Sequence, residues 1–183
     1  MLLNPKDVVD LTPKRSGSKI YAIEGSVVFM PADVIVNAAN SSLLGGGGVD
    51  GAIHQAAGPE LLEYCKMLDG AETGQAKITP AFAIDHAKYI VHAVGPIYSN
   101  SPSDPLLLAS CYQNSLDLAK KHNCKSIAFP SISTGVYGYP KSKAAQVSYQ
   151  AAKKWIEEKK EYFLAIYFCC YNKEEFDAYL KIK

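Results

Sequence analysis

Long apolar runs are missing from this sequence. A membrane-spanning helix needs about 20 consecutive apolar residues, and no run in the chain approaches that length. The first residues, Met1 to Asp7, also lack the basic-then-apolar order of a secretory signal peptide. We therefore expect a cytoplasmic protein that has no membrane partner.

An excess of charge of either sign is also missing. Lys and Arg together number 19 and Asp and Glu number 18, which gives a formal net charge of +1. Proteins that bind nucleic acid or anionic membranes through general electrostatics usually carry a basic patch or stripe. The balance of charge therefore predicts no such general binding.

Metal-ligand spacings are absent too. The sequence has 5 cysteines without a Cys-x-x-Cys pair, and its 4 histidines fall in different segments. Structural zinc sites draw their ligands from short, regular spacings of these two residue types. We expect reduced thiols and no bound metal.

The residues that are present predict an α/β fold. Short apolar runs rich in β-branched and aromatic residues indicate strands, at Ile20 to Ile23, Val34 to Val36, Tyr89 to Val94, Ser126 to Phe129 and Tyr162 to Cys170. Apolar residues at helical spacing, together with start signals, indicate helices. They are expected from near Val49, over Leu106 to His122, over Ala144 to Ile156, and after Asn172. Asn172 and Glu175 have the spacing of a variant capping box. Several strands lack polar alternation, so helices should cover both faces of a largely parallel sheet. No linker divides the chain, and residues 1–183 are expected to form a single domain.

Four consecutive glycines, Gly45 to Gly48, lie between a predicted strand and a predicted helix. Such a run is costly in conformational entropy, but it exposes backbone amides. The positive end of the helix dipole near Val49 adds to these amides, and together they favour an anion such as phosphate. A flexible or tightly turned connection is the alternative.

A second loop, Ser131 to Pro140, also follows a predicted strand and precedes a helix. Loops at the carboxyl ends of parallel strands can face each other across a crevice. No Lys or Arg occurs in residues 20–65 or 126–140, so a diphosphate held there would be bound by amides and hydroxyls. The alternative is that neither loop binds phosphate.

Two nucleotide-binding patterns are disfavoured. Gly46 to Gly51 matches G-x-G-x-x-G, but the glycines do not directly follow a strand, and no strand ending in an acidic residue lies about 20 positions further on. No Gly-Lys-Ser/Thr triplet occurs, which excludes a P-loop. A nicotinamide-dependent oxidoreductase is therefore disfavoured.

Four segments resemble the signatures of the macrodomain family, and most of all its MacroD-type branch: Val36 to Asn40, Gly45 to His54, His92 to Pro96 and Ser131 to Pro140. The similarity runs from about Tyr21 to the end of the chain. It implies a three-layer α/β/α fold with a central mixed, largely parallel sheet, ADP-ribose as the ligand and no required cofactor. It also implies hydrolysis of the ester that joins the distal ribose to an acidic protein side chain or, in O-acetyl-ADP-ribose, to acetate.

The resemblance implies roles for particular residues and partners. Asn40 would contact the distal ribose, and Asp50 matches an aspartate with a catalytic role. The other residues implied to bind ADP-ribose are Ser26, Val27, Gly46, Gly47, Gly48, Val49, Ser133, Thr134, Gly135, Val136, Tyr137 and Tyr171. The implied partners are ADP-ribosylated proteins or O-acetyl-ADP-ribose, with nucleic acid only if it is itself ADP-ribosylated, and we expect a monomer.

Both catalytic candidates have an alternative interpretation. Asp50 lies in a first helical turn, where it either stabilises the helix dipole or acts as a general base. Asn40 either holds sugar hydroxyls or forms an Asx-turn after the strand. His54, one turn beyond Asp50, is interpreted as a structural histidine with satisfied hydrogen bonds. A non-catalytic ADP-ribose reader is the alternative function, and the presence of both Asn40 and Asp50 argues against it.

One departure from the family concerns adenine. Relatives usually carry Gly-Asp-Ile where this chain has Gly25-Ser26-Val27, so the carboxylate expected to accept from the adenine amino group is missing. The serine hydroxyl is a weaker acceptor than a carboxylate. Tyr171 matches the position of an aromatic that packs on adenine, or it simply ends a strand.

Overall fold

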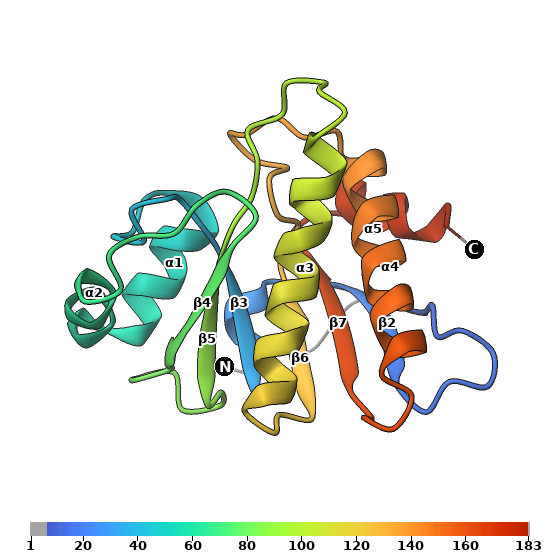
Figure 1. Cartoon of the computed structure of the whole chain (residues 1–183), viewed down its shortest axis with the longest axis horizontal. Coiled ribbons are helices and arrows are strands. Elements are labelled where there is room, and N and C mark those ends of the chain that lie inside the picture. The colour runs from blue at the N-terminus through green and yellow to red at the C-terminus, as the bar shows by residue number, and fades with distance from the viewer. Residues whose placement is uncertain (1–6, 183) are drawn as a thin grey trace.

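A computed structural model of the chain describes residues 7–182. Residues 1–6, most of the segment that lacks signal-peptide order, and Lys183 lie outside the described residues. The described residues form one seven-stranded sheet in the order β1-β2-β7-β6-β3-β5-β4 (Figure 1). The strands are β1 (Val8–Asp10), β2 (Lys19–Glu24), β3 (Val34–Ala39), β4 (Ala76–Pro80), β5 (Tyr89–Val94), β6 (Ser126–Phe129) and β7 (Ala165–Cys170).

The sheet is mixed, and its central strands are parallel. The five strands from β2 through β7, β6 and β3 to β5 pair in parallel with one another. The edge strand β1 pairs antiparallel with β2, and the other edge strand, β4, pairs antiparallel with β5. The expectation of a largely parallel sheet is confirmed.

Helices cover both faces of the sheet and make three layers (Figure 1). One face carries α3 (Asp104–Lys121), α4 (Lys141–Glu158) and α5 (Lys173–Leu180). The other face carries α1 (Gly48–Ala57), α2 (Pro59–Lys66) and the short 3-10 helix η1 (Val27–Phe29). The predicted α/β/α architecture is therefore confirmed.

The central strands are apolar on both faces because both faces are covered. In β3, Val34 and Val36 belong to the core that includes α3 and α4, whereas Ile35 belongs to the core that includes α1 and α2. All three side chains are fully buried. Since successive side chains of a strand point to opposite faces, such a strand shows no polar alternation.

β1, β4 and α2 were not predicted from the sequence. β1 has only 3 residues, and β4 has only one buried residue, Thr79, and ends in Pro80. Edge strands carry little apolar pattern, and they tolerate proline because one side is unpaired. α2 is separate from α1 because Gly58, with a φ of +84°, ends one helix and Pro59 begins the next.

Two predicted strand boundaries were wrong. β3 continues past Val36 to Ala39 and so includes the buried polar residue Asn37. This extension is tolerated because the buried amide has hydrogen-bond partners. β7 begins at Ala165 rather than at Tyr162.

The last helix begins at the predicted cap, with one change. The side chain of Asn172 accepts a hydrogen bond from the N–H of Glu175 at 3.0 Å, as expected. The carboxylate of Glu175 does not return the bond to Asn172. Its Oε2 accepts from the N–H of Tyr171 at 2.8 Å and from the hydroxyl of Ser131 at 3.0 Å. These bonds tie the start of α5 to the loop after β6.

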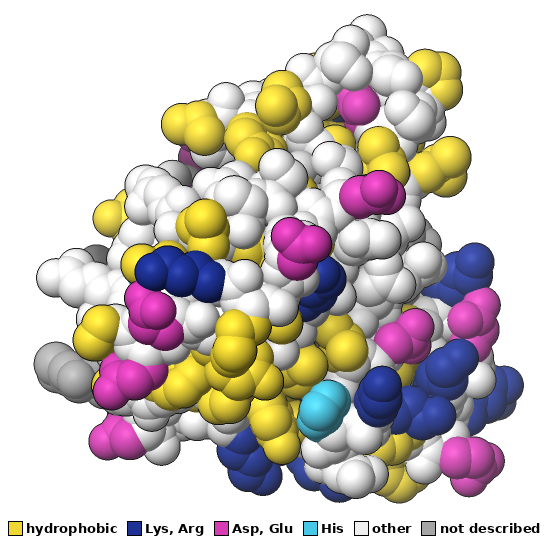
Figure 2. All heavy atoms as spheres, turned by 60° about the vertical axis from the view of Figure 1, so that its left-hand side comes forward, with side chains coloured by type: hydrophobic (Ala, Val, Ile, Leu, Met, Phe, Trp, Pro, Cys, Tyr) yellow, Lys and Arg dark blue, Asp and Glu magenta, His cyan; other side chains and the backbone are white. Residues whose placement is uncertain are grey.

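The surface over α1 and α2 carries charges of both signs. Figure 2, which turns this side of Figure 1 forward, shows Lys and Arg side chains among acidic and hydrophobic ones, without a continuous basic stripe. All five cysteines are free and buried, although their burial was not predicted. Among residues 7–182, no helix has both the length and the apolar character needed to cross a bilayer.

Candidate functional site

A cavity of about 620 Å³ lies at the carboxyl ends of the parallel strands. This volume is within the range of about 300–1,000 Å³ that is typical of small-molecule sites. The two glycine-containing loops face this cavity, as predicted. All the residues implied to contact the ligand line it: Ser26, Val27, Asn40, Gly46, Gly47, Gly48, Val49, Asp50, Ser133, Thr134, Gly135, Val136, Tyr137 and Tyr171. Their roles in binding stay predictions.

The strand order arranges the walls of the cavity in a row. Residues that follow β2 and β7 form one end, residues that follow β6 form the middle, and residues that follow β3 and β5 form the other end. Neighbouring strands lie about 4.8 Å apart, so the row from β2 to β3 spans about 14 Å. The cavity therefore suits an elongated ligand with different chemical groups at its two ends.

Within residues 7–182, the walls of the cavity that follow β6 and β3 offer backbone donors and no cation. The N–H groups of Gly46, Gly47, Gly135 and Val136 have no hydrogen-bond acceptor within residues 7–182. The N-terminus of α1, at Gly48, lies beside them. Among the described residues that line the cavity, none is Lys or Arg. Free amides at a helix N-terminus are a suitable site for a phosphate group.

Asp50 has one oxygen held by the protein and one oxygen free. Oδ1 accepts a hydrogen bond from Asn37 Nδ2 at 2.8 Å and lies 3.5 Å from His54 Nε2. Oδ2 has no hydrogen-bond partner in the described part of the chain, and a Cβ placed on Gly46 would lie 3.1 Å from it. Gly46 and Asp50 both line the cavity, so the free oxygen lies beside a residue of the cavity wall.

Burial raises the pKa of Asp50, while the Asn37 donor and the nearby His54 oppose the rise. A carboxylate whose pKa is raised by its surroundings is a better proton acceptor than an exposed one. Perturbed carboxylates in cavities are candidate catalytic groups. The environment of Asp50 therefore favours the chemical role over the helix-dipole alternative.

Asn37 was missed by the sequence analysis. Its side-chain amide donates to Asp50 and also to Nδ1 of His92, at 3.2 Å. Because Nδ1 accepts, Nε2 carries the ring proton and donates to Thr79 Oγ1 at 3.1 Å. Burial lowers the pKa of His92 to about 3, so the ring is neutral. The available signal was a polar residue inside each of two otherwise apolar strands, β3 and β5.

Replacing Asn37 with Ala is expected to shift the acid limb of the pH profile of kcat/KM to higher pH. The Asn37 amide favours the ionised form of Asp50, so its loss raises the pKa of Asp50 further. A general base must be ionised, and activity is then lost at a higher pH. Ester hydrolysis measured across the acid range checks this shift.

The matched control is Thr79→Val. It removes the hydroxyl that is hydrogen-bonded to His92 Nε2, and it leaves Asn37 and His54 in place near Asp50. Its acid limb should stay at the wild-type position. If the limb of Asn37→Ala also stays there, Asp50 is not the base that the profile reports.

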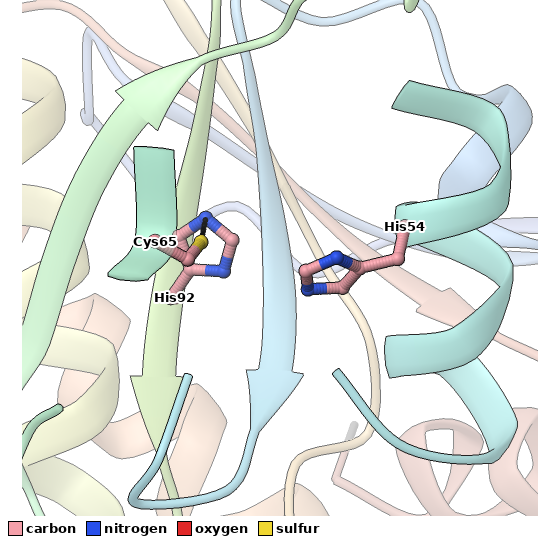
Figure 3. A group of neighbouring side chains, drawn as sticks. All are labelled: His54, Cys65 and His92. Carbon is pink, nitrogen blue, oxygen red and sulfur yellow. Dashed lines mark hydrogen bonds between the residues drawn. The ribbon is translucent and has the colours of Figure 1, made fainter. Parts of the chain in front are cut away.

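The structure also brings together three residues that lie apart in the sequence. In Figure 3 the ring of His54, on α1, points toward His92, on β5, and Cys65 of α2 lies beside His92. One ligand atom of each lies within 4.8 Å of the others. The separation expected between zinc ligands in a tetrahedral site is about 3.3–3.7 Å.

This cluster is held together without an ion. Both ring nitrogens of His92 have protein partners, and Cys65 Sγ lies 3.9 Å from His92 Nε2. Burial and the charge of Asp50 raise the pKa of Cys65 to about 11, which disfavours the thiolate that zinc binds. The expectation that the protein holds no metal stays a prediction.

His54 lies next to the cavity rather than in its wall. Its Nε2 atom is buried and has no hydrogen-bond partner within residues 7–182, although it is near Asp50 Oδ1. The interpretation of His54 as a structural histidine with satisfied hydrogen bonds was therefore wrong in this respect.

Asn40 forms the Asx-turn that was its alternative interpretation. Its Oδ1 accepts from the N–H and the hydroxyl of Ser42, at 3.1 and 2.6 Å, and its Nδ2 donates to the carbonyl of Gly45 at 3.0 Å. The same side chain lines the cavity. One amide hydrogen stays free, so the turn fixes Asn40 and leaves a donor for a ligand hydroxyl.

Gly95, directly after β5, is a further residue of the site that the sequence analysis quoted only within a motif. A Cβ at this position would overlap Ser133 Oγ and lie 2.6 Å from a methyl group of Ile132. Ser133 has a φ of +67°, and its buried hydroxyl has no partner among the described residues. Gly95 therefore allows the second loop to approach the sheet, with a free hydroxyl in the cavity wall.

The end of the cavity at β2 and β7 carries an aromatic ring and a carboxylate. Tyr171, 74% exposed, and Glu175 both line it. Ser26 stands where the family usually has an aspartate, and its Oγ accepts a hydrogen bond from the N–H of Val28 at 3.3 Å as the N-cap of η1. The Ser26 hydroxyl is thus already used as an acceptor within the protein.

Comparison with known proteins agrees with this fold and cavity. A family model described as Macro domain matches residues 36–148, which is more than half of the chain. The chain belongs to the Macro domain family. The macrodomain of Oceanobacillus iheyensis solved with ADP matches with a TM-score of 0.88 at 38% identity, covering 96% of this chain and 95% of that one. A variant of the same protein was solved with ADPR.

Two relatives differ in the share of their own length that this macrodomain matches. A Macro domain-containing protein of Chlorobaculum tepidum, CT2219, is 48% identical over 163 residues, which are 88% of this chain and 94% of that protein. The ADP-ribose glycohydrolase MACROD1 of Bos taurus is 46% identical over 168 residues, which are 91% of this chain and 51% of that protein. This macrodomain therefore spans nearly all of the first relative and about half of the second.

Proposed function

We propose that this macrodomain binds ADP-ribose and hydrolyses the ester that joins its distal ribose to an acidic protein side chain or, in O-acetyl-ADP-ribose, to acetate. The observation that carries the proposal is the geometry of Asp50. Its Oδ1 is held by Asn37 at 2.8 Å, and its Oδ2, which has no partner among residues 7–182, lies beside Gly46 of the cavity wall. The similarity to the ADP-ribose glycohydrolase MACROD1 supports the same class of activity.

ADP-ribose would lie along the row of strand ends. Its adenine would be at the β2 and β7 end beside Tyr171, and its diphosphate would bind the free amides of the two glycine-containing loops. The distal ribose would then reach the β3 end, where Asn40 offers an amide hydrogen. Asp50, hydrogen-bonded to Asn37 of β3, is at this reacting end of the cavity.

The reaction needs one water and no cofactor in this scheme. Asp50 Oδ2 accepts a proton from the water as its oxygen attacks the carbonyl carbon of the ester. The bond between that carbon and the ribose oxygen breaks, and the proton passes to the ribose oxygen. The products are ADP-ribose and a carboxylic acid. Asn40 would hold the sugar hydroxyls in the reacting geometry.

The test is release of ADP-ribose from a glutamate-ADP-ribosylated protein, with release of acetate from O-acetyl-ADP-ribose measured in parallel. Turnover of either substrate by the wild-type protein is expected. Tight binding of ADP-ribose without turnover of either would leave the reader function in place of the hydrolase. The single domain over residues 1–183 and the monomeric state stay predictions, which the elution volume of the purified protein checks.

Hydrolysis in water labelled with ¹⁸O locates the bond that breaks. Attack at the ester carbonyl places one label in the released glutamate carboxylate. An unlabelled carboxylate would show attack at the ribose carbon instead, and it would replace the carbonyl step given above while leaving Asp50 as the group that activates water.

A further inference from the structure

The cavity contains a second carboxylate that the proposed reaction does not use. Oε2 of Glu175 accepts from the N–H of Tyr171 at 2.8 Å and from the hydroxyl of Ser131 at 3.0 Å. Oε1 has no hydrogen-bond partner in the described part of the chain, and Glu175 lines the cavity. One oxygen is therefore fixed by two donors, and the other is an acceptor without a partner.

The sheet places Glu175 at the end of the cavity away from Asp50. Glu175 is bonded to Tyr171, which follows β7, whereas Asp50 is bonded to Asn37 in β3. β7 and β3 are separated by β6, so the strands next to which the two carboxylates are hydrogen-bonded lie about 10 Å apart. Glu175 therefore faces the part of the ligand that does not react.

The surroundings of Glu175 suit a flat heterocycle that carries a hydrogen-bond donor. The exposed ring of Tyr171 offers an aromatic face, and the buried Val27 and Cys169 are apolar parts of the same cavity wall. A carboxylate repels phosphate, so the diphosphate is not expected at this end. An acceptor without a partner selects a ligand that donates to it and disfavours one that offers another acceptor.

We propose that Glu175 is a specificity-determining residue that accepts a hydrogen bond from the exocyclic amino group of adenine. This inference rests on the proposed function, which makes ADP-ribose the ligand. It resolves the departure at Ser26: the carboxylate missing from that position is supplied from α5, while the Ser26 hydroxyl already accepts from Val28.

The test compares two ligands that differ at one position of the base. In inosine diphosphate ribose a carbonyl replaces the amino group of adenine. The carboxylate of Glu175 would then face a hydrogen-bond acceptor in place of a donor. We expect the wild-type protein to bind ADP-ribose more tightly than this analogue by about tenfold, the effect of one hydrogen bond to a charged acceptor. Titration calorimetry with each ligand gives the ratio.

The informative variant is Glu175→Gln. Glutamine keeps an oxygen that accepts from Tyr171 and Ser131, but it replaces the free acceptor with an amide donor. The preference for ADP-ribose should be lost or reversed in favour of the inosine analogue. Glu174→Gln is the matched control, because Glu174 is the adjacent residue and has an exposed carboxylate 3.3 Å from the ammonium of Lys141. That variant should keep the wild-type ratio.

The outcomes separate this inference from the proposed function. Equal affinity of the wild-type protein for the two ligands, or an unchanged ratio in Glu175→Gln, overturns the role of Glu175 while ADP-ribose binding stands. Failure of the wild-type protein to bind either ligand overturns the proposed function itself. A thermal unfolding midpoint measured for each variant shows that the ratios compare folded proteins.

Discussion

Replacing Asp50 with Asn is expected to lower kcat for ester hydrolysis by about 10²–10⁴-fold, the usual contribution of a general base. Asparagine keeps an oxygen that can accept from Asn37 and fills the same volume, but it cannot take a proton from water. The measurement is release of ADP-ribose from a glutamate-ADP-ribosylated protein at equal concentrations of folded wild type and variant. Asp50→Ala should show a loss of similar size.

The affinity for ADP-ribose should distinguish loss of the catalytic step from loss of the binding site. A carboxylate near a diphosphate disfavours the complex, so the neutral Asp50→Asn variant is expected to bind ADP-ribose at least as tightly as the wild type does. Retained binding with retained turnover would remove Asp50 from the mechanism. Weaker binding together with lost turnover would assign Asp50 to the binding of the ligand instead.

The stability of the same variant follows from the pKa of Asp50. Burial raises this pKa above the value in the unfolded chain, so the native state holds the proton more strongly and is stabilised at acid pH relative to neutral pH. That contribution is lost as pH rises through the folded-state pKa. Asparagine does not ionise, so at neutral pH the variant should unfold at or above the wild-type temperature.

Replacing Gly51 with Ala is expected to lower the affinity for ADP-ribose by about tenfold or more. Gly51 lies in the first turn of α1, and a Cβ there would be 2.6 Å from the carbonyl oxygen of Gly46. That oxygen belongs to the backbone and cannot rotate away as a side chain would, so the glycine loop must shift. Overpacking of this kind costs about 1–3 kcal/mol, which lowers the unfolding midpoint by about 2–12 °C for a chain of this size.

The matched control for stability is Gly47→Ala. Gly47 is in the same loop, has a φ of −94°, and a Cβ there would meet no atom within 4 Å. Its unfolding midpoint should therefore remain close to that of the wild type. An Ala at Gly51 that lowers the midpoint but leaves the affinity for ADP-ribose unchanged would show that the Gly46 segment does not contact the ligand.

The sequence by itself determined the central sheet and the two loops. Buried parallel strands are short apolar runs, and glycines between a strand and a helix expose amides; both signals come from residues that are neighbours in the chain. The edge strands β1 and β4 were not predicted because they are short or half exposed, and so their apolar pattern is weak. The MacroD-type motifs added ADP-ribose and the roles of Asn40 and Asp50.

Only the tertiary structure decided what holds the reacting group. Asn37 and His92 are 55 residues apart, and they meet because β3 and β5 pair in parallel with these two residues in register. The approach of Ser133 to Gly95 and the bond from Ser131 to Glu175 likewise join separate segments. Such contacts depend on strand order and register, which the hydrophobic pattern of one strand does not specify when both faces are buried. The sequence therefore supplied the groups that face the ligand, and the fold supplied the hydrogen bonds that orient them.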